Sequence, residues 1–325
     1  MAILNTIARL APPSTDGTIR PWAAWMVKKP IGALCRVAFR PSVAGWEHIP
    51  AEGGCLLVAN HSGGGLADVL VLAEAWLRQH GAERPVAGMA HPLVMIVPGL
   101  RDLFAALGAI PSTREAAEKA LGEGRAVLVF PGGDHESFRP IWQAGRVDMA
   151  GRKGFLKLAR TCQVPIVPIG ISGSHYTLPI LWRSELLPRL LVVPRLLGVK
   201  RFPITLTGVV TGAAAFAAVL PVLGVPGGVV AAVLCVASPV SWFLPVVPWS
   251  IKVKIGEAIP PEALFPDDDL AAPYVRVEGA VQRLVDELRG VVQGTTASRR
   301  TSTPEVTLQN PLKPVHASSS KVPVP

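Results

Sequence analysis

The chain has 325 residues, of which 50% are hydrophobic and 17% charged, with a formal net charge of +9 and a mean hydropathy of +0.39. This length accommodates one large domain with appendages. A chain that is both basic and apolar is more typical of a protein that binds an anionic membrane surface than of one that binds nucleic acid. It has only two tyrosines, which argues against a surface on which bases stack. The four cysteines have neither metal-type nor disulfide-type spacing, which predicts a reducing compartment and leaves the oligomeric state open.

Residues 1–42 are predicted to form basic amphipathic helices at a membrane interface. The stretch 17–46 contains five basic residues and no acid, together with Trp22 and Trp25. Tryptophan mixed with lysine and arginine is typical of interfacial helices, and Pro30 is expected to divide the stretch into two short helices. A helix packed on the domain with a solvated basic face is the alternative. No cleaved signal peptide is expected.

The residues from 43 to 201 are predicted to form the first part of an α/β domain. Short apolar runs bounded by glycine or proline indicate buried strands, and the stretches between them have helical periodicity. Such alternation predicts a sheet covered by helices on both faces, with ligands beyond the strand ends. The predicted strands are Leu56–Ala59, Val86–Met89, Ala126–Phe130 and Ile166–Ile171, and the predicted helices are Asp68–His80, Pro98–Leu107, Arg114–Glu123 and Lys153–Thr161.

Residues 202–250 are predicted to be an inserted apolar helical hairpin, embedded in a membrane. No Asp, Glu, Lys or Arg occurs from Phe202 to Ile251. Two apolar segments approach the ~20 residues that span a bilayer, and a break rich in proline and glycine separates them. Basic residues on both sides place the flanks, and so the catalytic domain, on the cytoplasmic face of the cytoplasmic membrane. A spanning, a re-entrant and a buried hairpin all remain open.

The domain is predicted to resume over residues 251–292. Ile251–Ile255 alternates like a returning strand, and Tyr274–Val292 has the pattern of an amphipathic helix. Residues 293–325 are rich in Ser, Thr and Pro without periodicity, which predicts a disordered tail.

The residues that predict chemistry begin at the end of the first strand. His61 and Ser62 lead from it into Gly63–Gly65, and Asp68 follows. A histidine and an aspartate so placed can form a dyad, in which the imidazole takes a proton from a hydroxyl while the carboxylate fixes its tautomer. Without that geometry Asp68 only caps a helix.

Further polar residues follow the later strands. Arg114 starts a predicted helix, where a guanidinium suits a phosphate or carboxylate, or else pairs with a nearby glutamate. Gly132 and Gly133 end another strand in a turn. Gly133 allows a ligand to approach the backbone, and Glu136 can accept hydrogen bonds from ligand hydroxyls. Two histidines are weaker candidates for the same pocket, His135 and His175.

These motifs, in this order, resemble the glycerolipid (lysophospholipid) acyltransferase family, and most of all its bacterial monoacylglycerol-acyltransferase-like branch. The resemblance covers about residues 43–262, without the apolar insertion. The matching blocks are Asn60-His61 with Asp68, Gly108 with Arg114, Phe130–Gly133 with Glu136, and Val164–Pro168. The spacing from His61 to Asp68 is two residues longer than in the family, which a bulge of the glycines could absorb. Gly132 stands where many members carry glutamate.

The resemblance implies a glycerolipid acyltransferase-like αβ sheet and a membrane-associated O-acyltransferase, similar to 1-acylglycerol-3-phosphate acyltransferases. It implies acyl-CoA or acyl-carrier-protein as donor, a glycerolipid or lysophospholipid hydroxyl as acceptor, His61 as general base and Asp68 as its orienting group. It implies no metal or other cofactor. The implied substrate-binding residues are Ser62, Gly63, Arg114, Gly132, Gly133 and Glu136.

Two other function classes remain open. A lipid esterase or thioesterase is suggested because His61–Gly65 faintly resembles a hydrolase oxyanion motif. However, no serine satisfies Gly-x-Ser-x-Gly, and Ser172 comes nearest. A non-catalytic lipid-binding protein on the same fold is the third class, supported by the long spacing between His61 and Asp68. Acceptor-dependent release of a thiol distinguishes the transferase from both.

Overall fold

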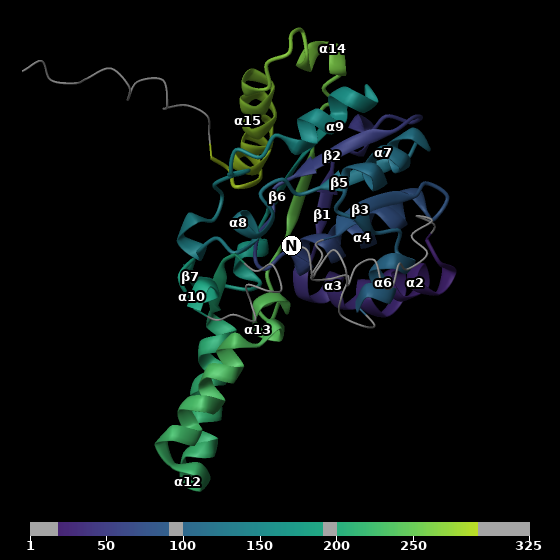
Figure 1. Cartoon of the computed structure of the whole chain (residues 1–325). Coiled ribbons are helices and arrows are strands. Elements are labelled where there is room, and N and C mark those ends of the chain that lie inside the picture. The colour runs from purple at the N-terminus through teal and green to yellow at the C-terminus, as the bar shows by residue number, and fades with distance from the viewer. Residues whose placement is uncertain (1–18, 91–99, 191–199, 292–325) are drawn as a thin grey trace, which may run out of the picture. The chain divides into compact units, whose positions relative to one another are not determined.

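The computed structural model describes residues 19–90, 100–190 and 200–291 (Figure 1). A seven-stranded sheet has the order β1-β9-β6-β2-β5-β3-β4, and its neighbours are parallel except for the pair β6–β9. The predicted α/β class is therefore confirmed. The strands are β1 (Ser42–Ala44), β2 (Cys55–Ala59), β3 (Val86–Ala90), β4 (Ile110–Pro111), β5 (Ala126–Val129), β6 (Ile166–Ser172) and β9 (Lys252–Ile255).

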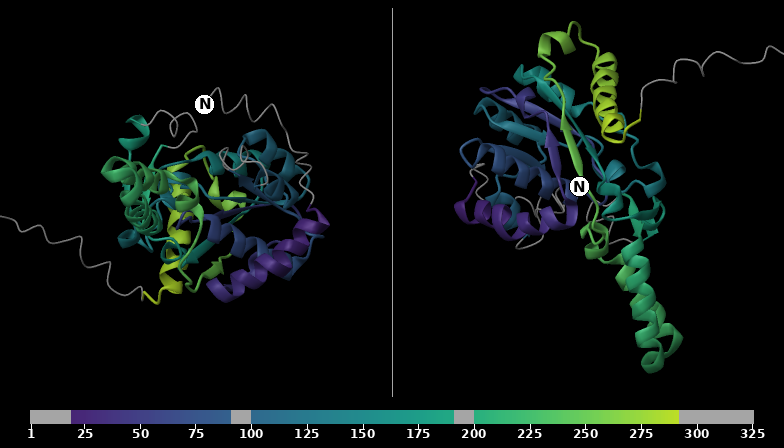
Figure 2. Two further views of the ribbon diagram at one scale, coloured as in Figure 1. Left: turned by 90° about the horizontal axis from the view of Figure 1, so that it is seen from below. Right: turned by 180° about the vertical axis from the view of Figure 1, so that it is seen from behind.

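Helices cover both faces of this sheet (Figure 2). Strand β2 is buried throughout, and successive side chains enter opposite cores: Leu56 and Val58 one, Leu57 and Ala59 the other. This explains why the strand is continuously apolar rather than alternating. The helices on the first face are α7 (Arg114–Gly122), α9 (Gly154–Cys162), α14 (Pro261–Leu264) and α15 (Ala271–Leu288); those on the second are α3 (Gly32–Phe39) and α4 (Leu66–His80).

The N-terminal region is helical without the expected break. Between α2 (Pro21–Met26) and α3, residues Val27–Ile31 form a π-helical turn that contains Pro30. The prediction of two helices divided at Pro30 is therefore wrong, because the wider turn accommodates a residue that cannot donate an i→i−4 hydrogen bond. Val27 packs near Leu77 of α4, whereas Trp22 and Trp25 are exposed.

A second, two-stranded sheet carries the apolar insertion. The antiparallel strands β7 (Ile180–Ser184) and β8 (Phe202–Thr205) were not foreseen from the sequence. They lead into α12 (Leu206–Ala237) and then α13 (Pro239–Phe243). Gly224 interrupts α12 with non-helical φ 63° and ψ −171°, so α12 consists of two helical arms. The remaining helices are α6 (Leu100–Ala106), α8 (Gly133–Ser137) and α10 (Leu187–Leu190).

Candidate active site

The central strand β2 delivers His61 to the carboxyl edge of the sheet. The side chain of Asn60, one residue earlier, bridges to the next strand: its Nδ2 donates to the Ile171 carbonyl at 2.9 Å, and its Oδ1 accepts from the Ile171 N–H at 2.7 Å. This buried pair of hydrogen bonds joins β2 to β6 just before the histidine. The backbone that carries His61 is therefore fixed to β6 as well as to its own strand.

The structure brings His61 and Asp68 into contact despite their long spacing. His61 Nδ1 lies 3.1 Å from Asp68 Oδ2, and the same oxygen accepts the Ser62 N–H at 2.9 Å. The intervening Gly63–Gly65 all have positive φ, between 55° and 87°, which glycine adopts without a steric penalty. The three glycines form a bulge that takes up the extra length, and α4 then starts with the fully buried Asp68 in its first turn.

The other ring nitrogen of His61 faces a glycine. A Cβ built on Gly65 would lie 2.2 Å from His61 Nε2, so only glycine leaves this nitrogen room. The imidazole stacks on Phe130, with ring centroids 4.0 Å apart, and the histidine side chain is 15% exposed. With Nδ1 held by a carboxylate, Nε2 is the nitrogen available to accept a proton.

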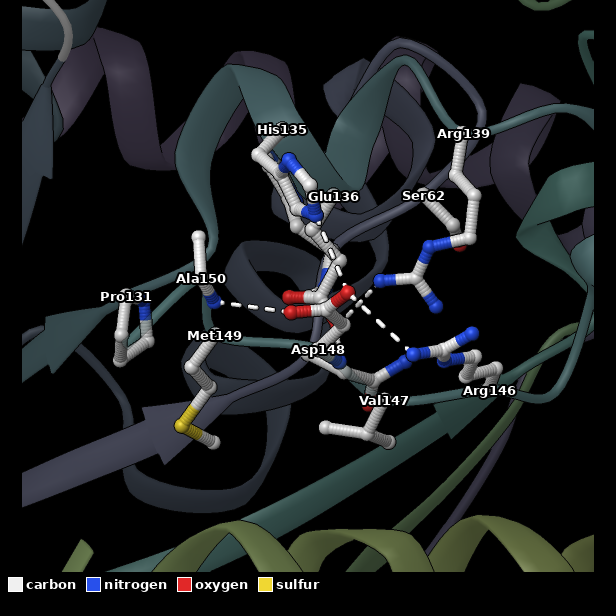
Figure 3. Close-up of polar contacts among 12 residues, drawn as sticks. Ser62, Pro131, His135, Glu136, Arg139, Arg146, Val147, Asp148, Met149 and Ala150 are labelled. Carbon is white, nitrogen blue, oxygen red and sulfur yellow. Dashed lines mark hydrogen bonds and ion pairs between the residues drawn. The ribbon is translucent and has the colours of Figure 1, made fainter. Parts of the chain in front are cut away.

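The carboxylate of Glu136 is buried among polar groups of the protein (Figure 3). Its Oε2 accepts the His61 N–H at 3.1 Å, and its Oε1 accepts both Arg139 Nη2 and the Asp148 N–H at 3.1 Å. Glu136 and Arg139 are each 1% exposed. The sequence led us to expect a head-group contact at Glu136, but the geometry makes it a brace that holds the backbone of the His61 turn.

Burial dominates the electrostatics of this brace. It raises the pKa of Glu136 to about 7, against the lowering by the Arg139 charge and by the N–H groups of Asp148 and His61. Burial, followed by the charges of Arg139 and Arg289, lowers the pKa of His175 to about 3, so His175 is neutral at physiological pH. Within the described residues, Arg139 Nη1 and His175 Nε2 are buried without a hydrogen-bond partner.

The structure gives the remaining predicted residues partners within the protein. Arg114 is bonded on the surface to Glu118 Oε1 at 2.6 Å and Thr161 Oγ1 at 3.1 Å, the pairing that the sequence offered as its alternative. His135 Nε2 pairs with Asp148 Oδ2 at 3.1 Å. The glycines make room for side chains: a Cβ would meet Glu136 at Gly132, Arg152 at Gly133 and the Ser174 carbonyl at Gly63.

Three residues that support the site from behind, Ser174, Arg139 and Asp148, were not predicted from the sequence. Ser174 is buried and its hydroxyl is hydrogen-bonded to that of Ser62, which was predicted to bind substrate and is itself buried. Arg139 stands three residues after Glu136, just past the end of α8, and this spacing was a usable signal for an ion pair. Ser174 and Asp148 had no such signal, because the tertiary fold brings them in from distant segments.

A family model matches the part of the chain that contains this site. Residues 40–172, which include His61, Asp68 and Glu136, match the family model described as Acyltransferase. The chain carries an acyltransferase-family domain. The resemblance inferred from the sequence motifs is confirmed at that level. The matched residues run in chain order from just before β1 to the end of β6, and the apolar insertion follows them.

Several proteins are similar to this chain. An uncharacterized protein of Mycobacterium tuberculosis (strain ATCC 25618 / H37Rv) is 34% identical over 167 residues, 51% of this chain and 45% of that protein. A Bos taurus protein, the DGAT1/2-independent enzyme synthesizing storage lipids, is 28% identical over 39% of this chain and 37% of its own length. The matches thus cover less than half the length of these curated relatives.

Among solved structures, the 1-acyl-sn-glycerophosphate (LPA) acyltransferase PlsC from Thermotoga maritima superposes with a TM-score of 0.48 at 18% identity. The superposition covers 89% of this chain and 88% of that one.

Gly65→Ala should abolish most turnover, because the added Cβ would occupy the position of His61 Nε2. Gly53→Ala is the matched control: Gly53 also has positive φ (78°), but a Cβ there meets nothing within 4 Å. Both variants bear the backbone strain of a left-handed alanine, about 1–2 kcal/mol. Initial rates of acyl transfer should therefore fall only for Gly65→Ala; equal losses would show that strain, and not the imidazole position, limits the site.

At a pH well above 7, where the Glu136 carboxyl is ionised, Glu136→Gln should lower the free energy of unfolding by roughly 3–5 kcal/mol, because it leaves the buried Arg139 guanidinium without a counter-charge. The double variant Glu136→Gln/Arg139→Met removes that charge and should regain part of the loss. Chemical denaturation of the detergent-solubilised chain measures both. Losses that simply add would show that the two side chains do not act as a pair.

Proposed function

We propose that this chain is a membrane-associated O-acyltransferase that moves a fatty acyl group from an acyl thioester to a hydroxyl of a glycerolipid or lysophospholipid. The observation that supports it best is the His61–Asp68 pair, held by Oδ2 at 3.1 Å with Nε2 left free, inside an acyltransferase-family domain. The thioester is a substrate, and the proposal requires no other cofactor.

The reaction follows from the position of the two ring nitrogens. His61 Nε2 takes the proton of the acceptor hydroxyl while its oxygen attacks the thioester carbonyl carbon. Asp68, paired with Nδ1, stabilises the imidazolium. The tetrahedral intermediate then collapses: the C–S bond breaks, the thiolate leaves, and the imidazolium returns the proton to it. The products are an ester and a free thiol.

The histidine turn also offers a donor for the oxyanion. Four of its five N–H groups are committed: His61 to Glu136, Ser62 to Asp68, and those of Gly64 and Gly65 to the carbonyls of Ser137 and Ser62. Within the described chain, the Gly63 N–H has no acceptor. We assign it to the tetrahedral oxyanion, where a positioned N–H contributes to transition-state stabilisation.

A serine hydrolase mechanism fits this geometry poorly. The serines next to the histidine turn, Ser62 and Ser174, are at most 1% exposed, and their hydroxyls bond to each other. A nucleophilic serine must reach the substrate carbonyl while bonded to the base. An external hydroxyl acting on His61 Nε2 meets no such obstacle.

A cavity of about 410 Å³ at the end of β6 suits the donor's phosphates. Arg40, Lys252 and Arg289 line it, and none of them forms an ion pair with an acid in the part of the chain that the structure describes. Tyr176 and Trp249 add an aromatic wall, with ring centroids 4.8 Å apart. Cations and aromatic rings together favour a phosphorylated, nucleotide-bearing thioester such as acyl-CoA.

Membrane association is supported by two exposed apolar surfaces. The insertion offers an 18-residue window of mean hydropathy 2.4 that is only 6% buried. The N-terminal helix exposes Trp22 and Trp25 beside Lys28 and Lys29. Basic residues combined with interfacial tryptophans fit an anionic, cytoplasmic membrane face.

His61→Ala should reduce kcat by about 10²–10⁴-fold or more, because it removes the general base. Asp68→Asn should reduce it by roughly 10²-fold or more, since the carboxamide favours the wrong tautomer. Thiol release from a long-chain acyl-CoA with a lysophospholipid acceptor measures both, and membrane flotation checks that both variants remain intact. A His61→Ala rate within a few-fold of the parent would contradict the mechanism.

Lys252→Ala/Arg289→Ala should raise KM for acyl-CoA by about tenfold with little change in kcat, because two charge-assisted contacts to phosphate are lost. Lys254→Ala is the control: it lies on the same strand, but its ammonium is paired with Glu287 at 2.6 Å. An unchanged KM in the double variant would remove the cavity from the donor site.

A further inference from the structure

We propose that α12 is a re-entrant membrane hairpin. It enters and leaves the membrane on the same face, its turn stays inside the hydrocarbon core, and its outer surface is covered by lipid acyl chains. The inference rests on the proposed membrane association and specifies its topology. It applies to a hairpin that the sequence alone leaves free to span, re-enter or lie buried.

The two arms pair with a constant antiparallel register. A Cβ on Gly208 would lie 3.4 Å from Val236 Cα, and one on Gly212 would lie 3.6 Å from Ala232 Cα. Gly228 similarly lies on the ring of Phe216. A position four residues further along the first arm therefore contacts a position four residues earlier in the second arm, as antiparallel helices require. The chain therefore reverses close to Gly224, and the 32-residue helix is not one continuous span.

Small residues lie where the two arms contact each other, as they do between closely packed membrane helices. The buried positions of α12 are Gly208, Gly212 and Gly228, all of them between the arms. The outward positions are aliphatic and exposed. They are Val209, Val210, Leu220, Val222, Leu223, Val225, Val229, Val230, Val233 and Leu234. The two arms thus pack on each other through glycines and expose aliphatic side chains on their outer surface. Such a surface suits contact with lipid acyl chains rather than with water.

The arms are shorter than the hydrocarbon core is thick. The first arm, from Leu206 to about Val222, holds about 17 residues, at the short end of what a spanning helix needs, and reaches roughly 25 Å at ~1.5 Å per residue. The second arm, from Val225 to Ala237, holds about 13 residues and reaches roughly 20 Å. The hydrocarbon core is ~30 Å thick. With the polar base (Thr205, Ser238 and Ser241) at the interface, the turn stops short of the far headgroups.

The turn itself is built for hydrocarbon. From Leu220 to Val230 no side chain is polar, and Val222 is 80% exposed. A spanning hairpin would place these residues in the far headgroup region, where charged or aromatic anchors are usual. Pro221 and Pro226 flank Gly224 and carry no N–H, so the turn has fewer backbone donors to leave unsatisfied in lipid.

The base of the hairpin has the features of a membrane surface. Trp182, paired with Ile204 at the start of the insertion, is 60% exposed. Exposed Lys200 lies just outside the apolar block. An aromatic and a cationic side chain at these positions fit the headgroups of an anionic leaflet.

The same base packs on the histidine turn. A Cβ on Gly64 would lie 2.3 Å from the Trp242 carbonyl, and the Val246 and Val247 N–H groups donate to the Thr177 carbonyl. Thr177 Oγ1 in turn donates to the Ser174 carbonyl at 2.8 Å. Insertion of the hairpin therefore places His61 near the lipid surface, where acceptors with buried acyl chains present their hydroxyls.

The test places a fluorophore at the turn of the full-length chain. Val225→Cys is labelled with an environment-sensitive nitrobenzoxadiazole dye, in a chain whose half-buried Cys162 and Cys235 are replaced by serine; Cys35 and Cys55 are buried. The protein is bound to unilamellar phosphatidylcholine–phosphatidylglycerol vesicles. Leu206→Cys, at the base, is the matched control and should be bleached by external dithionite.

A re-entrant turn predicts blue-shifted emission that resists external dithionite and Co²⁺ trapped inside the vesicles, but is quenched by spin labels on acyl chains. Quenching by the trapped Co²⁺ alone would show a spanning hairpin, and bleaching from outside would show a turn left in water. Either result overturns the proposal.

A second variant separates topology from activity. Val225→Arg, compared with Val225→Leu, should weaken vesicle binding by about 10²-fold, because a charge is costly inside a bilayer. Acyl transfer in detergent should be unchanged, since the turn lies far along the hairpin from His61. Unchanged vesicle binding would contradict the re-entrant turn. If the turn is buried in lipid but the chain shows no transfer activity, the re-entrant topology holds and the proposed function is refuted.

Discussion

The contact between His61 Nδ1 and Asp68 Oδ2 depends on three consecutive glycines with positive φ, and the rest of the site is arranged around it. The glycines lengthen the turn without moving its ends. They also permit approaches that a side chain would block: Gly63 to the Ser174 carbonyl, Gly64 to the Trp242 carbonyl and Gly65 to the imidazole. A turn this tightly surrounded has one conformation, which is what a positioned base requires.

Two supports of different chemistry hold this turn. On one side the buried Glu136 carboxylate bonds to the His61 N–H while it is paired with Arg139, so charge is enclosed directly behind the histidine. On the other side the support is apolar: Phe138 packs with Trp242 and Phe243 at the base of the hairpin. The turn is thus the point where the polar interior of the domain meets its apolar insertion. Such a boundary suits a reaction between a water-soluble thioester and a lipid hydroxyl.

The sequence predicted the elements whose signals are local. Strands β2, β3, β5 and β6 appeared as continuous apolar runs because both faces of the sheet are covered, and α4, α7 and α9 appeared as periodic stretches within one or two residues of their observed ends. Strands β7 and β8 were missed, because a short pair at the foot of an insertion is stabilised by a small tertiary core and not by its own pattern. The break at Pro30 was predicted wrongly because propensity takes no account of a π turn.

The site was predictable only in part, for the same reason. His61 and Asp68 are seven residues apart, and their approach required only that the glycines bulge. The orientation of Glu136 could not be read from its motif, since it depends on the His61 N–H, 75 residues away, and on the burial of Arg139. The sequence left two alternatives for Arg114, a ligand contact or a pairing with a glutamate, and the structure shows the guanidinium bonded to Glu118 one turn on.

The proposed role of His61 is to activate an external hydroxyl for attack on a thioester. The most direct test follows free thiol and acylated lipid together, with purified chain, a long-chain acyl-CoA, and a panel of lysophospholipid and acylglycerol acceptors beside a reaction without acceptor. The account predicts thiol release that requires an acceptor and equals the ester formed, mole for mole. Thiol release without any acceptor, and no ester formed when one is present, would contradict it and show a thioesterase.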